Sequence, residues 1–211
     1  MMKKGEHTSK AGATRQLLLD AALAVIGDKG YSAATVDEIV EVAGVSKGVA
    51  YYHFKSKADM AASILEEGMG ILVEEFERSA ADAPDAPTAL TGMIERFATT
   101  IYENRSFGRF FVAELWREGR AWSEAMRGYE QRLLQVIEGQ LARGQVEGII
   151  RPEIDPAFEA VALVGMVLTT TLYYITGDAS ATNIEPLGKD AFIERICDFV
   201  RHANASKGLL A

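Results

Sequence analysis

Three helix starts follow one another in a short segment of this sequence, and they constrain its fold more than any other feature. In the first, the Thr35 hydroxyl can accept a hydrogen bond from the amide of Glu38, while the Glu38 carboxylate accepts one from the amide of Thr35. Ser46 is a second N-cap residue, and the segment Ser56–Asp59 forms a weaker capping box. Gly44 permits a sharp turn before Ser46. The segment therefore predicts two short helices that cross steeply, followed by a longer helix.

Helical spacing recurs through the rest of the chain, and no sustained alternation of apolar and polar residues indicates a strand. An apolar face near the start ends at Gly30, a residue suited to a helix C-terminus, and consists of Leu18, Ala21, Ala22, Val25 and Ile26. The run around Pro84 and Pro87 is expected to be a loop. Beyond it we expect helices at about Thr88–Glu103, Phe107–Gly119, Trp122–Gln145, Pro156–Thr176 and Lys189–His202. The predicted fold class is all-α.

Charge is distributed unevenly along the chain. The formal net charge is −8, but residues 1–60 carry eight Lys and Arg against seven Asp and Glu, a balance of +1 that leaves −9 for the remainder. The acidic remainder is therefore excluded as a DNA-facing surface. The single cysteine, Cys197, excludes an internal disulfide framework, and we expect it to be a small buried residue in a reducing compartment.

Neither export nor membrane insertion is expected. The basic N-terminal residues lead into no apolar signal-peptide core. The uncharged stretch Ala160–Gly177 is about as long as the shortest membrane-spanning helices, but its four threonines and two tyrosines favour a helix buried on all sides. We therefore expect a cytoplasmic protein that does not bind membranes.

The segment 35–60 combines a capped helix, a glycine turn and a short second helix rich in aromatic and basic residues. This order is that of a helix-turn-helix, whose second helix enters the major groove of DNA while the first crosses the backbone. The stretch AGVSKGVAYYHFKSK resembles the tetracycline-repressor (TetR) family, and the preceding TRQLLLDAA and Gly30-Tyr31 resemble the first helix of that family. The resemblance covers about residues 14–60, less than a third of the chain.

The resemblance implies a homodimeric transcription repressor that binds double-stranded operator DNA and leaves it when a small molecule binds. It implies a flexible tail over residues 1–12, a helix-turn-helix DNA-binding domain over residues 13–60, and a helical ligand-binding and dimerisation domain over residues 61–211. It also assigns base edges to Lys47, Gly48 and Val49, and mainly phosphates to Thr35, Tyr51, Tyr52, His53 and Lys57. Hydroxyl, imidazole and ammonium groups are suitable phosphate donors, and a lysine can read guanine.

Several of these side chains have a second interpretation within the domain. Thr35 can cap its helix and contact a phosphate at the same time. Tyr51 is compatible with either the core or the DNA face, whereas Phe54 is expected in the core. His53 can bond to phosphate or within the domain.

The second half carries no motif of comparable specificity. An aromatic helix face there includes one carboxylate, since Phe107, Phe110, Phe111 and Glu114 lie at i, i+3, i+4 and i+7. One interpretation is a pocket in which Glu114 selects a polar or cationic ligand group, with a wall formed by Phe107, Phe110, Phe111, Trp116, Trp122, Met126 and Tyr129. The commoner outcome for such a stripe is plain core, with Glu114 paired to Arg109 or Arg117.

Two of the expected helices, Pro156–Thr176 and Lys189–His202, are apolar enough to need a partner. One face of the second helix carries Phe192, Ile196, Phe199 and Val200. The resemblance implies that they form a four-helix dimer interface. A two-fold dimer presents two recognition helices to successive major grooves about 34–36 Å apart, so the operator is expected to be a near-palindrome. Ligand binding would favour a dimer whose DNA-reading heads are wrongly spaced, with the helix after Ser56 carrying the change.

No enzyme is expected, because the sequence contains no dinucleotide or P-loop glycine pattern, no nucleophile elbow and no histidine pair at ligand spacing. Neither a cofactor nor a metal is expected. The alternative class is an all-helical adaptor or architectural protein without ligand-controlled operator binding, and the basic, aromatic second helix of the motif argues against it. The effector, the operator sequence and the choice between repression and activation cannot be read from these residues.

Overall fold

The computed structural model describes residues 10–115, 117, 119, 120, 122–171, 173, 174 and 185–205. Its named elements are all helices, so the predicted all-α class is confirmed for this part of the chain. They are α1 (Lys10–Lys29), α2 (Val36–Ala43), α3 (Lys47–His53), α4 (Lys57–Asp82), α5 (Ala86–Glu103), α6 (Arg105–Leu115), α7 (Ser123–Val146), α8 (Pro156–Thr171) and α10 (Lys189–Asn204).

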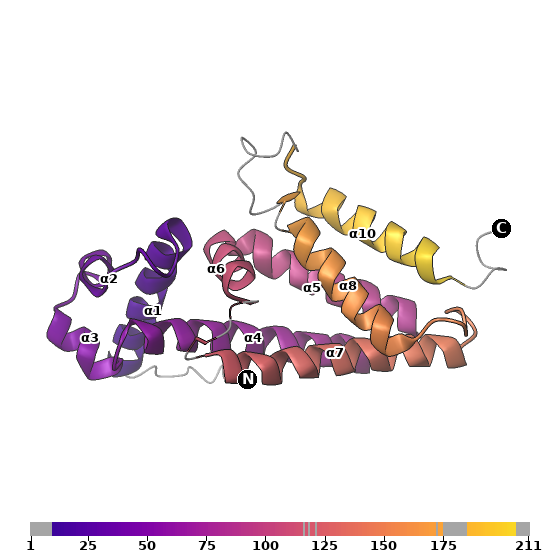
Figure 1. Ribbon diagram of the computed structural model, residues 1–211, viewed down its shortest axis with the longest axis horizontal. Helices are drawn as coiled ribbons and strands as arrows, with labels where there is room; N and C mark the ends of the chain where they lie inside the picture. The colour runs from indigo at the N-terminus through magenta and orange to yellow at the C-terminus, as the bar shows by residue number, and fades with distance from the viewer. Residues whose placement is uncertain are drawn as a thin grey trace, which may run out of the picture.

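The helices form two groups that the long helix α4 connects (Figure 1). α1, α2 and α3 cluster at one end of the molecule, and α4 starts there and runs alongside α7, below α6 and α10 in this view. α4 packs against both α5 and α7, and α7 packs against α8. In Figure 1, α8 and α10 lie toward the end of the molecule away from α3, so the exposed surface of α3 and that of α8 and α10 are separate.

The helix starts of the first group form as their capping residues predict. Thr35 is the N-cap of α2: its Oγ1 accepts from the Glu38 amide at 3.3 Å, and the Glu38 carboxylate accepts from the Thr35 amide at 3.0 Å. Gly44 follows α2 with φ 65°, in the left-handed region that favours glycine. Ser46 then caps α3 by accepting from the Val49 amide at 3.3 Å. The sharp turn between α2 and α3 is thus set by local chemistry.

The core of this group is the apolar face predicted for the first helix. Leu18, Ala21, Ala22, Val25 and Ile26 are all buried, and α1 ends before Gly30, whose φ is 79°. Phe54 is buried as predicted, and the Arg15 guanidinium lies 5.1 Å from the centre of its ring. Arg15 also donates to Glu67 on α4 at 2.6 Å, which ties α1 to the connecting helix.

In the second group, one helix differs from prediction at both ends, and another begins at its predicted residue. The helix predicted for Phe107–Gly119 spans Arg105–Leu115, because the Asn104 side chain accepts from the Phe107 amide at 3.0 Å and starts the helix earlier. The helix predicted from Pro156 does begin there, after Asp155 accepts from the Ala157 amide at 3.0 Å. It is described to Thr171, and part of its predicted end lies outside the described residues.

One predicted apolar face divides between the interior and the surface. Phe192, Ile196 and Val200 of α10 are buried, and α10 packs on α5. Phe199 is 61% exposed. It precedes Val200 by one residue, so it points in a different direction around the helix axis, away from α5. No helix in the described ranges is both long and apolar enough to cross a membrane.

Candidate DNA-binding surface and ligand pocket

Helix α3 presents almost its whole surface to solvent. Ala50 is its buried residue and anchors it to the core. Tyr51 is 54% exposed and Tyr52 is 82% exposed, so Tyr51 is not a core aromatic. Gly48 is also open, since a Cβ added there would meet only the Ser46 hydroxyl, at 3.8 Å. A short helix with so little burial has a free face that fits into a groove.

Lys47, the predicted base reader, lies at the start of this exposed face. Its ammonium forms an ion pair with Asp37 on α2. The hydrogen bond from Lys47 to Asp37, together with their charge attraction, raises the pKa of Lys47. Both side chains are more than half exposed, so water screens the pair and the ammonium can leave it for a base or phosphate.

Lys57, a predicted phosphate contact, has its ammonium turned into the protein. It donates to the carbonyl oxygens of Tyr31 and Ala34 at 2.6 Å each and lies 4.4 Å from the centre of the Tyr31 ring. Burial lowers the pKa of Lys57, and the positive charge of Arg120 adds to that shift. This geometry favours a structural role over a phosphate contact.

The remaining predicted DNA contacts differ in their exposure. Thr35 is exposed, and its hydroxyl also donates to the Glu38 carboxylate at 2.9 Å. A phosphate would therefore compete with Glu38 for the hydroxyl proton of Thr35. His53 is half-buried and packs edge-on against Tyr52, with ring centres 5.1 Å apart. Val49 is 37% exposed on α3. Of these three side chains, Thr35 and Val49 are exposed and His53 packs against Tyr52.

The aromatic face predicted as a pocket wall forms a junction between the two groups of helices. We call Tyr31, Phe110, Glu114, Arg120 and Trp122 the junction cluster. The Trp122 ring lies edge-on to Tyr31 at 4.8 Å and to Phe110 at 6.1 Å between centres. The Arg120 guanidinium lies 4.8 Å from the centre of the Tyr31 ring. These contacts bring the end of α1 against α6 and the start of α7.

Glu114 is buried in this cluster and paired with arginine side chains, which is the arrangement expected when such an aromatic helix face belongs to the core. It accepts from Arg120 Nε at 3.0 Å, and Arg117 Nε lies 3.8 Å from its other oxygen. Arg117 was one of the two arginines expected, and Arg120, the closer partner, was not. A carboxylate at 5% exposure is stable only when it is paired in this way. Glu114 is therefore already neutralised by the protein itself.

Two glycines let α6 approach the neighbouring helices closely. A Cβ at Gly27 of α1 would lie 2.6 Å from the Ser106 Cβ and 2.8 Å from its Cα. A Cβ at Gly68 of α4 would lie 2.2 Å from the Phe107 ring, which stacks on Phe111 with centres 5.8 Å apart. A methyl group at Gly27 would meet the backbone of Ser106, and one at Gly68 would have to displace the Phe107 ring, so α6 is in close contact with both α1 and α4.

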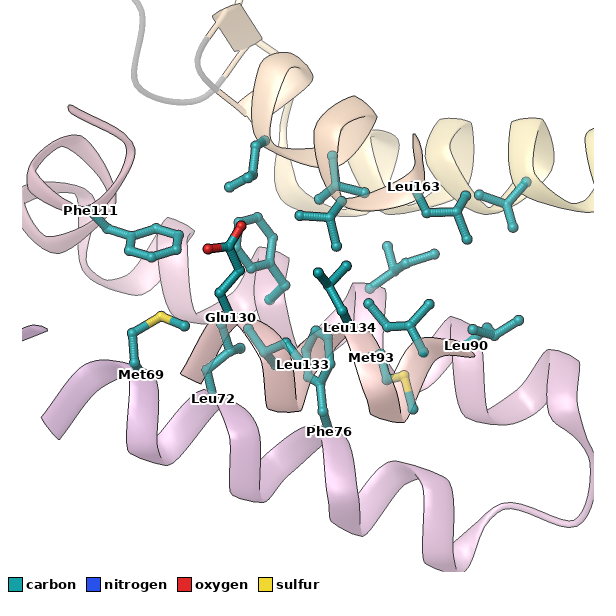
Figure 2. A pocket seen from close by; sticks show the side chains of 17 residues that line it. Met69, Leu72, Phe76, Leu90, Met93, Phe111, Glu130, Leu133, Leu134 and Leu163 are labelled. Carbon is teal, nitrogen blue, oxygen red and sulfur yellow. The ribbon is translucent and has the colours of Figure 1, made fainter. Parts of the chain in front are cut away.

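An apolar pocket lies elsewhere, between α4, α5, α6, α7, α8 and α10 (Figure 2). Of the predicted wall it shares only Phe111. Among the others, Met126 is buried and Tyr129 is half-buried outside this lining, and Trp116 lies outside the described residues. The lining consists of Met69, Leu72, Phe76, Leu90, Met93, Ile94, Phe97, Phe111, Glu130, Leu133, Leu134, Ile137, Leu163, Val164, Val167, Leu168 and Val200.

The missed lining residues have the spacing of ordinary core positions. Met69, Leu72 and Phe76 on α4 follow i, i+3 and i+7, which does not distinguish a cavity wall from a filled core. One signal was available. Glu130 interrupts the apolar face of α7 that includes Met126 and Leu134, and a carboxylate in such a position is unusual.

Comparison with known proteins identifies the family. The sequence profile described as bacterial regulatory proteins, tetR family, matches residues 18–64, which include α2 and α3. Transcriptional regulator AcuR of Cereibacter sphaeroides is 31% identical over 152 residues, which are 68% of this chain and 69% of that protein. The chain belongs to the tetR family. It is a DNA-binding transcriptional regulator, as the resemblance implied, and α2 and α3 are its helix-turn-helix.

Two further similarities concern lipid-related regulators of this family. The fatty acid metabolism regulator protein of Bacillus subtilis is 26% identical over 165 residues, 76% of this chain and 83% of that protein. The crystal structure of the regulator FadR from Bacillus subtilis in complex with stearoyl-CoA has a TM-score of 0.67 at 22% identity, covering 86% of this chain and 97% of that one. Because this structural similarity covers 86% of the chain, the shared fold includes the helices around the pocket as well as the DNA-binding helices.

Proposed function

We propose that this tetR-family regulator is a repressor that binds a near-palindromic operator as a homodimer, and that an elongated apolar molecule entering the pocket releases it. The observation that carries the proposal is that one helix serves both sites. Met60 at the start of α4 is buried in the core beneath the DNA-binding helices, while Met69, Leu72 and Phe76 of the same helix line the pocket. A displacement at one end of a continuous helix reaches the other.

On the DNA side, α3 enters the major groove. Lys47, Gly48 and Val49 face base edges, and Thr35, Tyr51, Tyr52 and His53 contact phosphates. Their exposure and their hydroxyl, imidazole and ammonium groups support these roles. Lys57 is left out, since its ammonium is bound to two carbonyl oxygens. Residues 13–60 serve as the DNA-binding unit and residues 61–211 as the ligand and dimer unit, with the boundary inside α4.

A second copy of the chain covers the exposed apolar residues of α8 and α10. Phe158 and Val161 of α8 are 71% and 58% exposed, and Phe199 of α10 is 61% exposed. Large apolar side chains in such number on two helices mark a protein interface. A two-fold pairing here leaves both α3 helices free and fixes the distance between them. Operator DNA lies on the bacterial chromosome or on a plasmid, both of which are in the cytoplasm, so the dimer acts there.

The ligand has a long apolar part. Residues from six helices line the pocket, and its lining is almost entirely aliphatic or aromatic. The cavity volume is about 80 Å³, whereas pockets that hold drug-sized ligands measure about 300–1,000 Å³. A ligand of that size therefore has to push helices apart. This requirement couples ligand binding to the spacing of the DNA-binding heads, since α4 and α6 form part of the wall.

Selection of bound sequences from random DNA tests the DNA-binding part. We expect a short inverted repeat, whereas the absence of any enriched sequence would favour the adaptor alternative. Release is then measured by fluorescence anisotropy on that repeat, using long-chain alkyl compounds with neutral, anionic and cationic heads. Light scattering measures the oligomeric state, and a monomer would contradict the proposal.

A pocket-filling variant separates ligand release from DNA binding. Leu134→Trp places a large ring in the cavity and is expected to bind the repeat but to resist release. Val146→Trp on the same helix is the control, because Val146 is 90% exposed and does not line the pocket. Equal release of the two variants would show that the ligand binds elsewhere.

A further inference from the structure

Among the described residues, the pocket lining includes a single ionisable group. Of the seventeen residues that line it, sixteen are apolar and the other is Glu130. Figure 2 shows the Glu130 carboxylate directed into the pocket, beside Phe111 and on the same helix as Leu133 and Leu134. Polar groups are rare in such cavities and usually fix the orientation of the ligand.

Glu130 differs from Glu114 in what neutralises it. Glu114 is held by Arg120 and Arg117. Among the described residues, no lysine, arginine or histidine forms an ion pair with Glu130, and the lining contains no basic side chain. Glu130 is half-buried, so its carboxylate faces the apolar cavity with no cation of the described residues beside it, and a cation or hydrogen-bond donor brought by a ligand can pair with it.

A second buried polar group lies on α8, one turn beyond the pocket lining. Helix α8 packs against α7, the helix that contains Glu130. Thr171 follows the lining residues Val167 and Leu168 by one turn of α8. Its side chain is fully buried, and its hydroxyl has no hydrogen-bond partner among the described residues.

We propose that Glu130 selects an amphiphilic effector with a cationic amine head, whose alkyl or aromatic body fills the apolar part of the pocket. This inference rests on the pocket being the effector site. The ammonium pairs with the Glu130 carboxylate beside Phe111 of α6, and the body extends toward Leu90 and Leu163, which Figure 2 shows at the other end. A free fatty acid with its carboxylate at Glu130 is repelled.

The test compares three ligands that differ only in the head group: dodecylamine, dodecanol and dodecanoate. Their affinities for the full-length protein are measured by calorimetry below the concentration at which each forms micelles. We expect dodecylamine to bind about tenfold more tightly than dodecanol, and dodecanoate to bind more weakly than either, because a close charge pair in an apolar site exceeds a neutral contact by at least one decade.

The variant Glu130→Gln keeps the shape of the side chain and removes its charge. It is expected to lower the dodecylamine affinity about tenfold and to raise the dodecanoate affinity, while dodecanol binding stays within about twofold and reports that the pocket is intact. Glu138→Gln is the matched control, since Glu138 is exposed on the same helix and does not line the pocket.

The possible failures differ in what they overturn. If dodecanoate binds the unaltered protein as tightly as dodecylamine, or if Glu130→Gln and Glu138→Gln change the amine affinity equally, the role of Glu130 is wrong while the pocket remains the effector site. If none of the three ligands binds or releases DNA, the pocket itself is not the effector site.

Discussion

The DNA-binding motif and the pocket depend on contacts of different range. In the motif, the bonds that start α2 and α3 join residues three apart, Thr35 with Glu38 and Ser46 with Val49. In the second region, the Ala86 amide donates to Glu147 across 61 positions, and Arg132 pairs with Glu77 across 55. A contiguous segment therefore specifies the first site, whereas the second exists only after distant helices meet.

The largest expected effect comes from breaking the contact between the two regions. Gly27→Ala puts a methyl group against the backbone of Ser106, which cannot rotate away. We expect the free energy of unfolding to fall by about 3 kcal/mol, the upper end for overpacked sites. Urea denaturation measures it. Gly128→Ala is the control: a Cβ there meets nothing within 4 Å, and replacing a helical glycine is expected to stabilise by about 0.5–1 kcal/mol. Equal stabilities of the two variants would contradict the close packing of α1 and α6.

Lys57→Met is expected to act on folding rather than on DNA. It removes two charge-assisted hydrogen bonds to Tyr31 and Ala34, and we expect a loss of about 2 kcal/mol in unfolding free energy. Lys55→Met, at an exposed position nearby, provides the comparison. Unchanged stability together with weaker, less salt-dependent DNA binding would instead restore Lys57 as a phosphate contact.

Lys47→Ala sharpens the assignment of the recognition helix. A lost base contact is expected to relax preference at one operator position by about 1.5 kcal/mol, roughly tenfold. Tyr52→Ala, which removes a phosphate donor, is expected to weaken binding to all sequences alike. Sequencing the DNA retained by each variant distinguishes the two patterns, and an identical loss of preference in both would refute the division of roles.

Thr35→Ala tests how much the local signal contributes. Loss of this N-cap is expected to reduce the unfolding free energy by about 1 kcal/mol, and Thr35→Ser to restore most of it. The hydrogen bond from Lys29, followed by those from Thr35, lowers the pKa of Glu38 below its usual 4.5. The stabilisation by this carboxylate is therefore present above that pH and is lost as the pH falls through the lowered pKa. Denaturation at neutral and at acidic pH should show a smaller effect of Thr35→Ala in acid.

The smallest effect concerns the ion pair on the DNA-binding surface. Asp37→Asn frees the Lys47 ammonium and removes a negative charge from the surface. Because exposed pairs contribute little, we expect operator affinity to rise by about 0.5 kcal/mol, roughly twofold, at low salt and to return to normal at high salt. Anisotropy titrations at two ionic strengths measure this change. Weaker binding by Asp37→Asn would mean that Asp37 positions Lys47 for DNA.

Prediction from the sequence succeeded for the local features of the DNA-binding segment, although Lys57 of that segment turns inward. The turn at Gly44, the cap at Ser46 and the exposed α3 were all predictable, because the residues that define them are neighbours in the chain. The apolar pocket lies apart from most of the predicted wall and shares Phe111 with it. Phe110 and Trp122 have the composition of a ligand wall, but they are used to join α6 to Tyr31.

By itself, the amino-acid sequence determined the all-α class, the helix starts of the DNA-binding segment and the DNA-binding motif, since capping and helical periodicity act over a few residues. Only the tertiary structure decided that Lys57 turns inward, that Glu114 is neutralised by Arg120, and that Glu130 faces an apolar cavity. The physical reason is that periodicity shows which face of a helix is buried but not what it is buried against. A filled core and a ligand cavity have the same pattern until the opposing helices are in place.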